Sequence, residues 1–345
     1  MNIAVYSDKF SGTLSASEVI EVVKESFENN SIKASYFPVT DAGEDSSIIF
    51  KQHGIKVEKT ISAEDLSGFK KEIELLNVSG DIFFESSLLI GINNTNGDTR
   101  DLNTACLSEI IESTDVIGLG GSKTNDGGFG LLSKMGVDFF SDNKLIEPKP
   151  NNFEKITSVE INDKYKKLNK KVLVDTSIPL MGNRSAIEIF GPQKGLDVES
   201  INNITSNIER IIGLIANNFE IKPDATKEGT GAAGGLGFAF SEILGCNLVS
   251  GAEYFLEKSG LEEKINSYDI SILCEGRFDK TSMEGKILGQ ILKKNKGTSY
   301  FLGGIYDHED LNIFENIYEC GEKGLNNPKK ELLTATNKLI SQIKI

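Results

Sequence analysis

The order of apolar and polar positions near the N-terminus indicates a strand followed by a helix. Residues 3–6 are a short apolar run, and a polar loop at 8–13 follows them. Ser15 and Glu18 then have the Ser-x-x-Glu spacing of a capping box, and apolar residues follow at 20, 23 and 27, which is helical spacing. We therefore expect a helix that begins directly after Ser15.

The same alternation continues at 34–39 and returns at the C-terminal end of the chain. Residues 34–39 read as a second strand, residues 269–274 and 299–302 as strands, and residues 285–294 as the helix between them. Strands that alternate with helices in this way form a mostly parallel sheet. Both ends of the chain therefore predict an α/β fold.

The middle of the chain has a different pattern. Residues 70–78 and 82–84 read as short antiparallel strands, and isoleucines spaced along 199–218 predict a long amphipathic helix. We therefore expect an α/β domain of residues 66–274, inserted into a domain that residues 1–65 and 275–345 form together.

Composition and charge exclude several classes of protein. The chain has 345 residues with 51 acidic against 37 basic side chains and a net charge of −14, which disfavours nucleic acid as a partner. No apolar run approaches the ~20 residues of a membrane span, and the N-terminus lacks the basic start of a secretory signal. The four cysteines form no CxxC pair, which argues against a disulfide scaffold and structural zinc. We expect a cytoplasmic protein without a membrane or nucleic-acid partner.

Glycine-rich turns that carry a charged or hydroxyl residue recur along the chain. Backbone N–H groups in such turns form nests for oxyanions, especially where a helix follows. Lys194, Arg277 and Lys286 lie inside them, which gathers positive charge locally in an acidic chain. The four turns are GLGGSKTNDGG at 118–128, FGPQKG at 190–195, GTGAAGGLG at 229–237 and EGRFDKTSMEGK at 275–286.

Each turn also has a purely structural interpretation, and two nucleotide motifs can be set aside. Asp126 could cap a helix that starts near Gly128, and Lys194 and Lys286 could be solvated surface lysines. The order of residues 121–124 departs from a Walker A loop by one position. The G-x-G-x-x-G at 229–234 follows a polar segment instead of the apolar strand that a dinucleotide fingerprint requires.

Read in order, these stretches resemble the motifs of the type 1 glycerate kinase family. That family carries D-x-F-K-G-[ST]-L-[ST]-A, D-G-G-E-G, G-G-S-x-T-N-D-G-G, F-G-P-Q-K-G, G-A-G-A-A-G-G-L-G and G-E-G-R-x-D. The corresponding stretches here are DKFSGTLSA at 8–16, DAGED at 41–45, GGSKTNDGG at 120–128, FGPQKG at 190–195, GTGAAGGLG at 229–237 and CEGRFD at 274–279.

The resemblance implies a two-domain fold and a reaction. One domain would be a Rossmann-like parallel sheet formed by both chain ends, and the inserted domain would have a mixed sheet, with ATP and glycerate meeting in the cleft between them. The implied reaction is the ATP-dependent phosphorylation of D-glycerate to a phosphoglycerate, 2-phosphoglycerate above all, with Mg²⁺ as cofactor. A small hydroxy acid would be the partner, and a homodimer is compatible with the family.

Several positions depart from the family motifs. Ser11 replaces a lysine, Ala42 and Asp45 replace glycines, Cys274 replaces another glycine, and Ile178 stands in place of an asparagine. These changes leave two alternatives open. The chain could be a kinase for another small hydroxy acid, or a divergent ligand-binding or regulatory member without turnover.

Residue type suggests the role of each candidate. Phosphoryl transfer needs positioning, charge neutralisation and usually Mg²⁺ held by carboxylates. Asp126 or Asp279 would accept the hydroxyl proton, Lys194 would neutralise developing charge, and Asp41 and Glu44 are the candidate Mg²⁺ ligands. The residues expected to bind substrate or phosphate are Asp8, Gly120, Gly121, Ser122, Asn125, Gly234, Gly235, Arg277 and Lys286.

Overall fold

The computed structural model describes residues 1–219 and 221–343, and the chain divides into two compact units. Unit 1 consists of Met1–Asp41 and Ala252–Ile345, and unit 2 consists of Ala42–Gly251. This division differs from the boundaries expected after residues 65 and 274. Strand β3 (Lys56–Glu64) pairs antiparallel with β4 (Lys70–Val78), and this pairing ties β3 to the sheet of unit 2.

Unit 1 contains a five-stranded sheet whose paired strands are all parallel, in the order β16-β14-β12-β1-β2. Every residue of β1 and β12 is buried, as expected for central strands covered on both faces. A small parallel pair, β13 with β15, lies beside the main sheet. The strands are β1 (Ile3–Ser7), β2 (Ser35–Pro38), β12 (Ile270–Cys274), β13 (Arg277–Asp279), β14 (Thr298–Gly303), β15 (Ile305–Asp307) and β16 (Asn316–Glu319).

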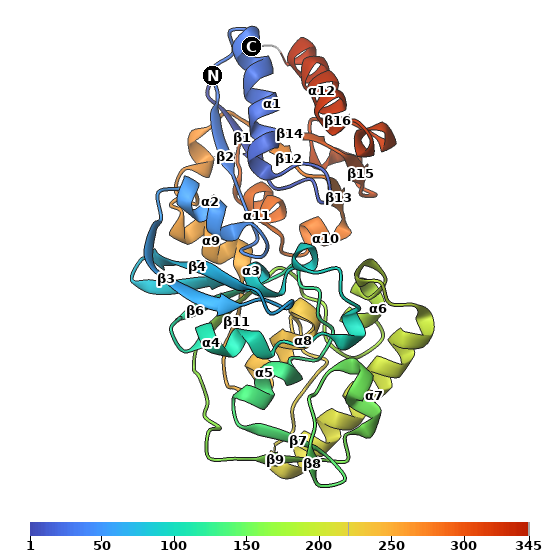
Figure 1. The fold of residues 1–345 in the computed structure, drawn as a ribbon. Helices are drawn as coiled ribbons and strands as arrows, with labels where there is room; N and C mark the ends of the chain where they lie inside the picture. Colours follow the sequence, from blue (N-terminus) through green and yellow to red (C-terminus); the bar gives the residue numbers. More distant parts are fainter. Residues whose placement is uncertain (220, 344–345) are drawn as a thin grey trace. The chain divides into compact units, whose positions relative to one another are not determined.

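Helices of unit 1 pack on this sheet through apolar stripes. Helix α1 begins after Ser15 with the expected capping box, because the Ser15 hydroxyl accepts from the Glu18 N–H and the Glu18 side chain accepts from the Ser15 N–H. Helices α1 and α12 lie side by side in Figure 1, and their apolar residues share one core with β1 and β12. The helices are α1 (Ala16–Asn29), α9 (Gly251–Lys258), α10 (Lys280–Met283), α11 (Ile287–Lys294) and α12 (Pro328–Gln342).

Unit 2 contains a six-stranded mixed sheet in the order β11-β10-β6-β5-β4-β3. The hairpin strands β3, β4 and β5 are antiparallel, and β5, β6, β10 and β11 pair in parallel. A separate three-stranded sheet has the order β8-β7-β9. The remaining strands are β5 (Asp81–Glu85), β6 (Val116–Leu119), β7 (Val137–Ser141), β8 (Lys144–Leu145), β9 (Ser158–Ile161), β10 (Lys171–Val174) and β11 (Asn247–Ser250).

The helices of unit 2 include the long amphipathic helix that the isoleucine spacing predicts. In α7, Ile201, Ile204, Ile208, Ile211 and Ile215 are buried, which confirms that prediction. The helices are α2 (Ser46–Gln52), α3 (Ser87–Ile90), α4 (Ser108–Ile111), α5 (Phe129–Lys134), α6 (Ala186–Phe190), α7 (Val198–Phe219) and α8 (Ala232–Phe238).

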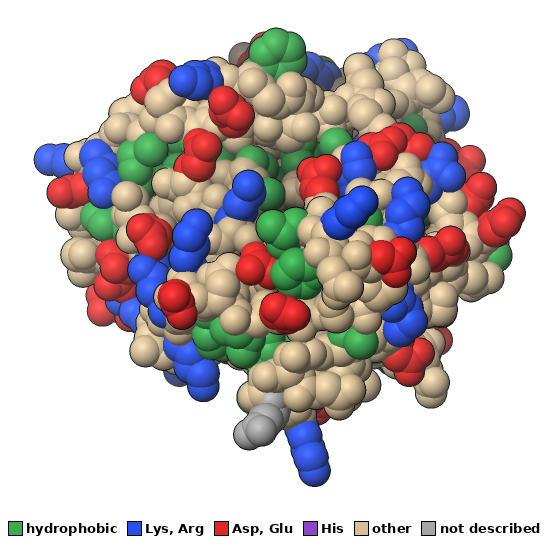
Figure 2. All heavy atoms as spheres, turned by 60° about the horizontal axis from the view of Figure 1, so that its bottom comes forward, with side chains coloured by type: hydrophobic (Ala, Val, Ile, Leu, Met, Phe, Trp, Pro, Cys, Tyr) green, Lys and Arg blue, Asp and Glu red, His purple; other side chains and the backbone are tan. Residues whose placement is uncertain are grey.

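The α/β fold class is therefore confirmed, with one parallel sheet built from both chain ends and one mixed sheet from the middle. None of the helices in the described part of the chain has the length and apolar stretch that a membrane span requires. Figure 2 shows acidic and basic side chains interspersed over the face in view. The net charge is thus not gathered into one patch on that face.

Candidate functional site

Unit 1 has a switch point at the carboxyl ends of β1 and β12. The chain continues from β1 to β2 on one side of the sheet, and β12, β14 and β16 follow on the other side. In parallel α/β sheets the loops at such a point diverge and leave room for ligands. Asp8 directly follows β1 and Glu275 directly follows β12, and the Asp8 N–H donates to the Cys274 carbonyl at 3.0 Å.

Glu275 is a buried residue at this point that the sequence analysis did not single out. The residue is 6 % exposed, and its Oε2 accepts from the Ser282 hydroxyl at 2.9 Å. Its Oε1 lies 3.7 Å from the Lys286 ammonium. Burial raises the pKa of Glu275 to about 7, although the charge of Lys286 opposes this shift. The sequence signal that could have identified it is a glutamate placed directly after the strand-like run at 270–274.

Lys286 lies among four carboxylates, and we call these five residues the Lys286 cluster: Asp8, Asp41, Glu275, Asp279 and Lys286. Burial disfavours the charged form of the lysine, but the surrounding carboxylates outweigh it and raise the pKa of Lys286. Lys286 is also the residue before α11, where the Ile287 N–H donates to Asp41 Oδ1 at 2.5 Å. The solvated-surface interpretation of Lys286 therefore does not fit its surroundings.

Asp279 and Arg277 form the outer part of this site. Asp279 caps α10, since its Oδ1 accepts from the Thr281 N–H at 2.8 Å and the Thr281 hydroxyl at 2.6 Å. Burial by itself would raise the pKa of Asp279. The hydrogen bonds from Thr281 and the charge of Lys286 together outweigh burial, so the net shift of the pKa is downward. Arg277 is exposed, forms an ion pair with Asp307, and its Nε lies 3.8 Å from Asp279 Oδ2.

The raised pKa of Glu275 predicts a pH dependence of stability. The pKa of a glutamate in the unfolded chain is about 4.3. Between about pH 4 and 7 the folded chain therefore binds more protons than the unfolded chain does, and the free energy of unfolding falls as pH rises through this range. From pH 5 to pH 8 we expect the wild type to lose about 2 kcal/mol relative to Glu275→Gln. Urea unfolding of both proteins at the two pH values measures this. Parallel pH profiles of the two proteins would contradict it.

In unit 2 the glycine-rich turn follows β6 and leads into α5. A Cβ added at Gly120 would lie 2.8 Å from the Gly43 Cα and 2.9 Å from Asp175 Oδ2. A Cβ at Gly121, where φ is +61°, would lie 3.0 Å from the Glu44 Cβ. The glycines here permit close approach of the 43–44 segment and of Asp175, the residue that follows β10.

The turn at 118–128 also packs directly against the turn at 229–237. The Gly127 N–H donates to the Gly234 carbonyl at 3.0 Å. A Cβ at Gly234, where φ is +69°, would lie 2.0 Å from the Thr124 carbonyl oxygen, and one at Gly235 would lie 2.5 Å from the Gly127 Cα. The glycine content of both turns is therefore required by backbone–backbone contact within unit 2.

Two of the departures from the family motifs fall at left-handed backbone positions. Ala42 has φ of 60° and Asp45 has φ of 69°, and the family motif has glycine at both. The left-handed region costs a residue with a Cβ roughly 1–2 kcal/mol, and aspartate tolerates it better than alanine. Ala42 and Asp45 thus adopt a backbone conformation that suits glycine, and both are strained in it.

This strain predicts that Ala42→Gly stabilises the protein. We expect the free energy of unfolding to rise by about 1 kcal/mol, measured by urea denaturation. The control is Ala239→Gly, at a buried position with φ of −58°, where glycine should destabilise by about 1 kcal/mol. Destabilisation by Ala42→Gly would show that the alanine methyl packs better than we infer.

Lys194 is buried against the loop that follows β6. Its ammonium donates to the Ser122 hydroxyl at 3.2 Å, to the Thr124 carbonyl at 2.7 Å and to Asn125 Oδ1 at 3.1 Å. Burial lowers the pKa of Lys194 to about 7, although the charges of Asp126 and Asp175 oppose this shift. The surface interpretation of Lys194 does not fit a side chain that is 5 % exposed.

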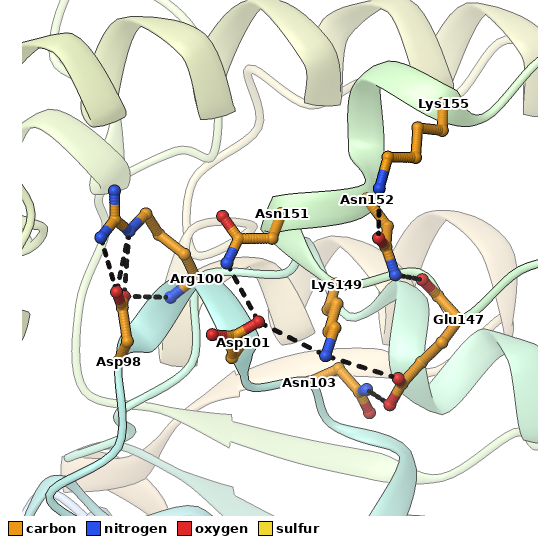
Figure 3. Close-up of polar contacts among 9 residues, drawn as sticks. All are labelled: Asp98, Arg100, Asp101, Asn103, Glu147, Lys149, Asn151, Asn152 and Lys155. Carbon is orange, nitrogen blue, oxygen red and sulfur yellow. Dashed lines mark hydrogen bonds and ion pairs between the residues drawn. The ribbon is translucent and has the colours of Figure 1, made fainter.

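The backbone of Lys194 is held as well, by the segment around residue 99. The Thr99 hydroxyl donates to the Lys194 carbonyl at 2.7 Å. Polar contacts at the surface lie within this segment and tie it to the segment around residue 151 (Figure 3). Arg100 pairs with Asp98, and Asp101 accepts from the Asn151 amide at 3.0 Å.

Asp126 is fully buried and caps the start of α5. Its Oδ2 accepts from the Thr104 N–H and the Thr104 hydroxyl, both at 2.8 Å, and from the Gly130 N–H at 3.0 Å. Its Oδ1 accepts from the Gly128 N–H at 3.3 Å. Burial raises the pKa of Asp126, although these hydrogen bonds act to lower it. This geometry supports the capping interpretation, and the catalytic role stays a prediction.

Glu44 lines a hollow of about 500 Å³ on unit 2, with Asn93, Asn94 and Ser87 also in its wall. The Asn93 amide donates to Glu44 Oε1 at 3.4 Å. Within residues 1–219 and 221–343, no group of three or more His, Cys, Asp or Glu side chains is arranged to hold a metal ion. The metal-ligand roles expected for Asp41 and Glu44 stay predictions.

The structure therefore brings the candidate residues together in two sets. The set in unit 1 consists of Asp8, Asp41, Asp279, Lys286 and the exposed Arg277. The set in unit 2 consists of Gly120, Gly121, Ser122, Asn125, Asp126, Lys194, Gly234, Gly235 and Glu44. The role of each residue in a reaction stays a prediction.

Comparison with known proteins links this geometry to one family. A family model described as "Glycerate kinase family" matches residues 3–310. A Bacillus cereus protein named glycerate kinase is 30% identical over 306 residues, which is 83% of this chain and 80% of that protein. The Escherichia coli protein named glycerate 2-kinase has the same identity and coverage. The fold is also similar to that of a crystal structure from Salmonella typhimurium LT2 that is named as a glycerate kinase 2. The TM-score is 0.71 at 23% sequence identity, and the match covers 99% of this chain and 98% of that chain.

Proposed function

The chain belongs to the glycerate kinase family, whose members transfer a phosphoryl group to an alcohol, and from that premise we propose that it phosphorylates D-glycerate. We propose ATP as the donor and 2-phosphoglycerate as the product. The observation that carries the proposal is the Lys286 cluster at the carboxyl edge of the parallel sheet, where a charged lysine is held among carboxylates. Phosphoryl transfer relies on positioned charge of this kind.

The charge balance of the Lys286 cluster supports a metal-complexed polyphosphate as its ligand. The carboxylates of Asp8, Asp41, Glu275 and Asp279 all act electrostatically on one ammonium group, so a bare anion would meet net negative charge. Mg²⁺ is usually held by one or two carboxylates together with substrate phosphates, which does not require a complete protein cage. Within the cluster, Asp41 offers a carboxylate for this purpose, and the metal-ligand role expected for Glu44 in unit 2 stays a separate prediction. Bound Mg²⁺ would supply positive charge to the phosphate oxygens.

The two positive side chains of unit 1 suggest complementary roles. Lys286 is partly exposed beside buried Glu275, so its ammonium can donate to a phosphate oxygen while the glutamate fixes its position. The exposed guanidinium of Arg277 can contact an anion with two parallel N–H groups. Asp279 is the candidate acceptor for the hydroxyl proton, and its lowered pKa keeps it ionised at neutral pH.

A direct assay tests the proposal. Purified protein is incubated with Mg·ATP and D-glycerate, ADP release is followed, and the product is identified by whether enolase converts it directly, as it does 2-phosphoglycerate. We expect ADP release that depends on both D-glycerate and Mg²⁺. Turnover only with another short hydroxy acid would replace the substrate, and ATP binding without turnover of any such acid would favour a regulatory member of the family.

A further inference from the structure

The contacts of Lys194 determine how the side-chain amide of Asn125 is oriented. The Lys194 ammonium has three hydrogens, and it has three oxygen neighbours, on Ser122, Thr124 and Asn125. Because an ammonium group only donates, the atom of Asn125 that faces it at 3.1 Å must be the carbonyl oxygen Oδ1. The amide nitrogen Nδ2 is therefore turned away from Lys194.

This orientation is kept when Lys194 loses its proton. The neutral amine has two hydrogens and one lone pair, and the Ser122 hydroxyl can then donate to that lone pair. The Thr124 carbonyl and Asn125 Oδ1 accept only, so they keep the two remaining donors. The charged groups that act on Lys194 are Asp126, Asp175 and Lys123, and burial lowers its pKa to about 7.

The Asn125 amide nitrogen is a donor whose hydrogens are unused. Asn125 is fully buried, and no hydrogen-bond acceptor for its Nδ2 is found in the described part of the chain. A buried donor without an acceptor costs about 1–3 kcal/mol, so native structures rarely keep one without a purpose. The Asn125 donor lies on the glycine-rich turn, next to Asp126, where the family motif places its polar residues.

We propose that Lys194 is a positioning residue that fixes the Asn125 amide, and that Asn125 Nδ2 donates to an anionic oxygen of a substrate. This inference rests on the proposed function and deepens it, because it assigns the ligand contact in unit 2 to Asn125 and not to Lys194. With all its hydrogens engaged, Lys194 cannot contact a substrate oxygen without giving up one of its three partners. The acceptor oxygen belongs to a carboxylate, as in glycerate, or to a phosphate, as in ATP.

A double-mutant cycle tests whether Lys194 acts through Asn125. Asn125→Ala, Lys194→Met and the double variant are compared with wild type by KM for D-glycerate, KM for ATP and kcat. We expect each single variant to raise one of the two KM values by roughly tenfold, with kcat changed much less. We expect the double variant to show about the same tenfold rise, since both changes remove one contact. The substrate whose KM rises identifies the source of the anionic oxygen.

A surface pair provides the matched control. The Lys155 ammonium donates to Asn152 Oδ1 at 3.4 Å on the exposed side of unit 2 (Figure 3). Lys155→Met, Asn152→Ala and their double variant remove the same chemical groups. We expect all their KM values to stay within about twofold of wild type, because an exposed pair of this kind contributes little.

Two results would overturn the inference. One is a double variant whose KM rises by roughly a hundredfold, the product of the single effects, because Lys194 would then act independently of Asn125. The other is an Asn125→Ala variant that leaves both KM values within about twofold of wild type. If Lys194→Met does not fold, Asn125→Asp decides the question. The aspartate keeps the shape of the side chain and forms an ion pair with Lys194, but it replaces the Nδ2 donor by an acceptor oxygen. We expect this variant to raise the KM that Asn125→Ala raises, by at least tenfold and at an unchanged Tm.

Failure of the proposed function gives a different result. Wild type that shows no turnover of D-glycerate contradicts the function, and the inference is then tested by calorimetric titration with Mg·ATP alone and with D-glycerate alone. Weaker binding of either probe by Asn125→Ala, together with an equal loss in the double variant, supports the inference. Unchanged binding in Asn125→Ala, or no binding of either probe to wild type, overturns it.

Discussion

The Lys286→Met variant is expected to lose at least ~100-fold in kcat/KM for the phosphorylation of D-glycerate. Lys286 is the ammonium group at the centre of the Lys286 cluster, and methionine keeps its apolar stem but not its charge. Steady-state kinetics with varied ATP and varied D-glycerate measure the loss. The control is Lys280→Met, an exposed lysine that pairs with Glu284 along α10 and should stay within about twofold.

A second variant separates the contact with substrate from the contact with Glu275. Removing one partner of a buried ion pair typically costs about 3–5 kcal/mol, because the remaining charge is left unpaired. Glu275 has a pKa of about 7, so it can take up a proton near neutral pH and reduce this cost. Because Lys286 is also partly exposed, we expect Lys286→Met to cost less than this, and we expect the double variant Lys286→Met/Glu275→Gln to be at least as stable as Lys286→Met and to remain inactive. Activity within threefold of wild type in Lys286→Met would remove Lys286 from the proposed site.

The Asp126→Ala variant is expected to lower the free energy of unfolding by at least about 3 kcal/mol, and Asp126→Asn by about 1 kcal/mol. Alanine leaves the Thr104 N–H, the Thr104 hydroxyl and the Gly130 N–H without their buried acceptor. Asparagine keeps one oxygen for these three donors and loses only the long bond from the Gly128 N–H at 3.3 Å. Urea denaturation measures both changes, and Thr104→Ser, which keeps both donors, is the control.

The Asp126→Asn variant also tests the catalytic role proposed for Asp126 from the sequence. A cap is replaceable by asparagine, so kcat should stay within about threefold of wild type. A general base acts through its charge, so its loss would reduce kcat by ~10²-fold or more. That larger loss, at a Tm close to that of wild type, would contradict our structural interpretation and restore Asp126 as a catalytic residue.

Local chemistry explains which parts of the site could be predicted from the sequence. The capping box of Ser15 and Glu18 and the isoleucine stripe of α7 depend on residues a few positions apart, and both are found as expected. The motif order also identified the family, because motifs preserve residue types along the chain. Lys194 and Lys286 were expected to gather positive charge, and the structure places both in buried or partly buried polar surroundings.

Sequence spacing could not reveal the contacts between distant segments. Glu275 lies eleven positions before Lys286, but no periodicity indicates that its carboxylate holds that lysine. The two glycine-rich turns of unit 2 read as separate anion nests, whereas they pack against each other through Gly127 and Gly234. The division of the chain after residue 41 follows from the pairing of β3 with β4, which depends on register and not on composition.

The sequence by itself determined the class of fold, the family and the residue types available for chemistry, because local patterns and the order of the motifs along the chain indicate all three. Only the tertiary structure decided which of these residues are engaged by others. The carboxylate of Asp126 and the ammonium group of Lys194 are both engaged in buried hydrogen bonds. The Nδ2 donor of Asn125 has no partner among the described residues. The free energy of such groups depends on neighbours from distant segments, and only folding brings those neighbours within hydrogen-bond distance.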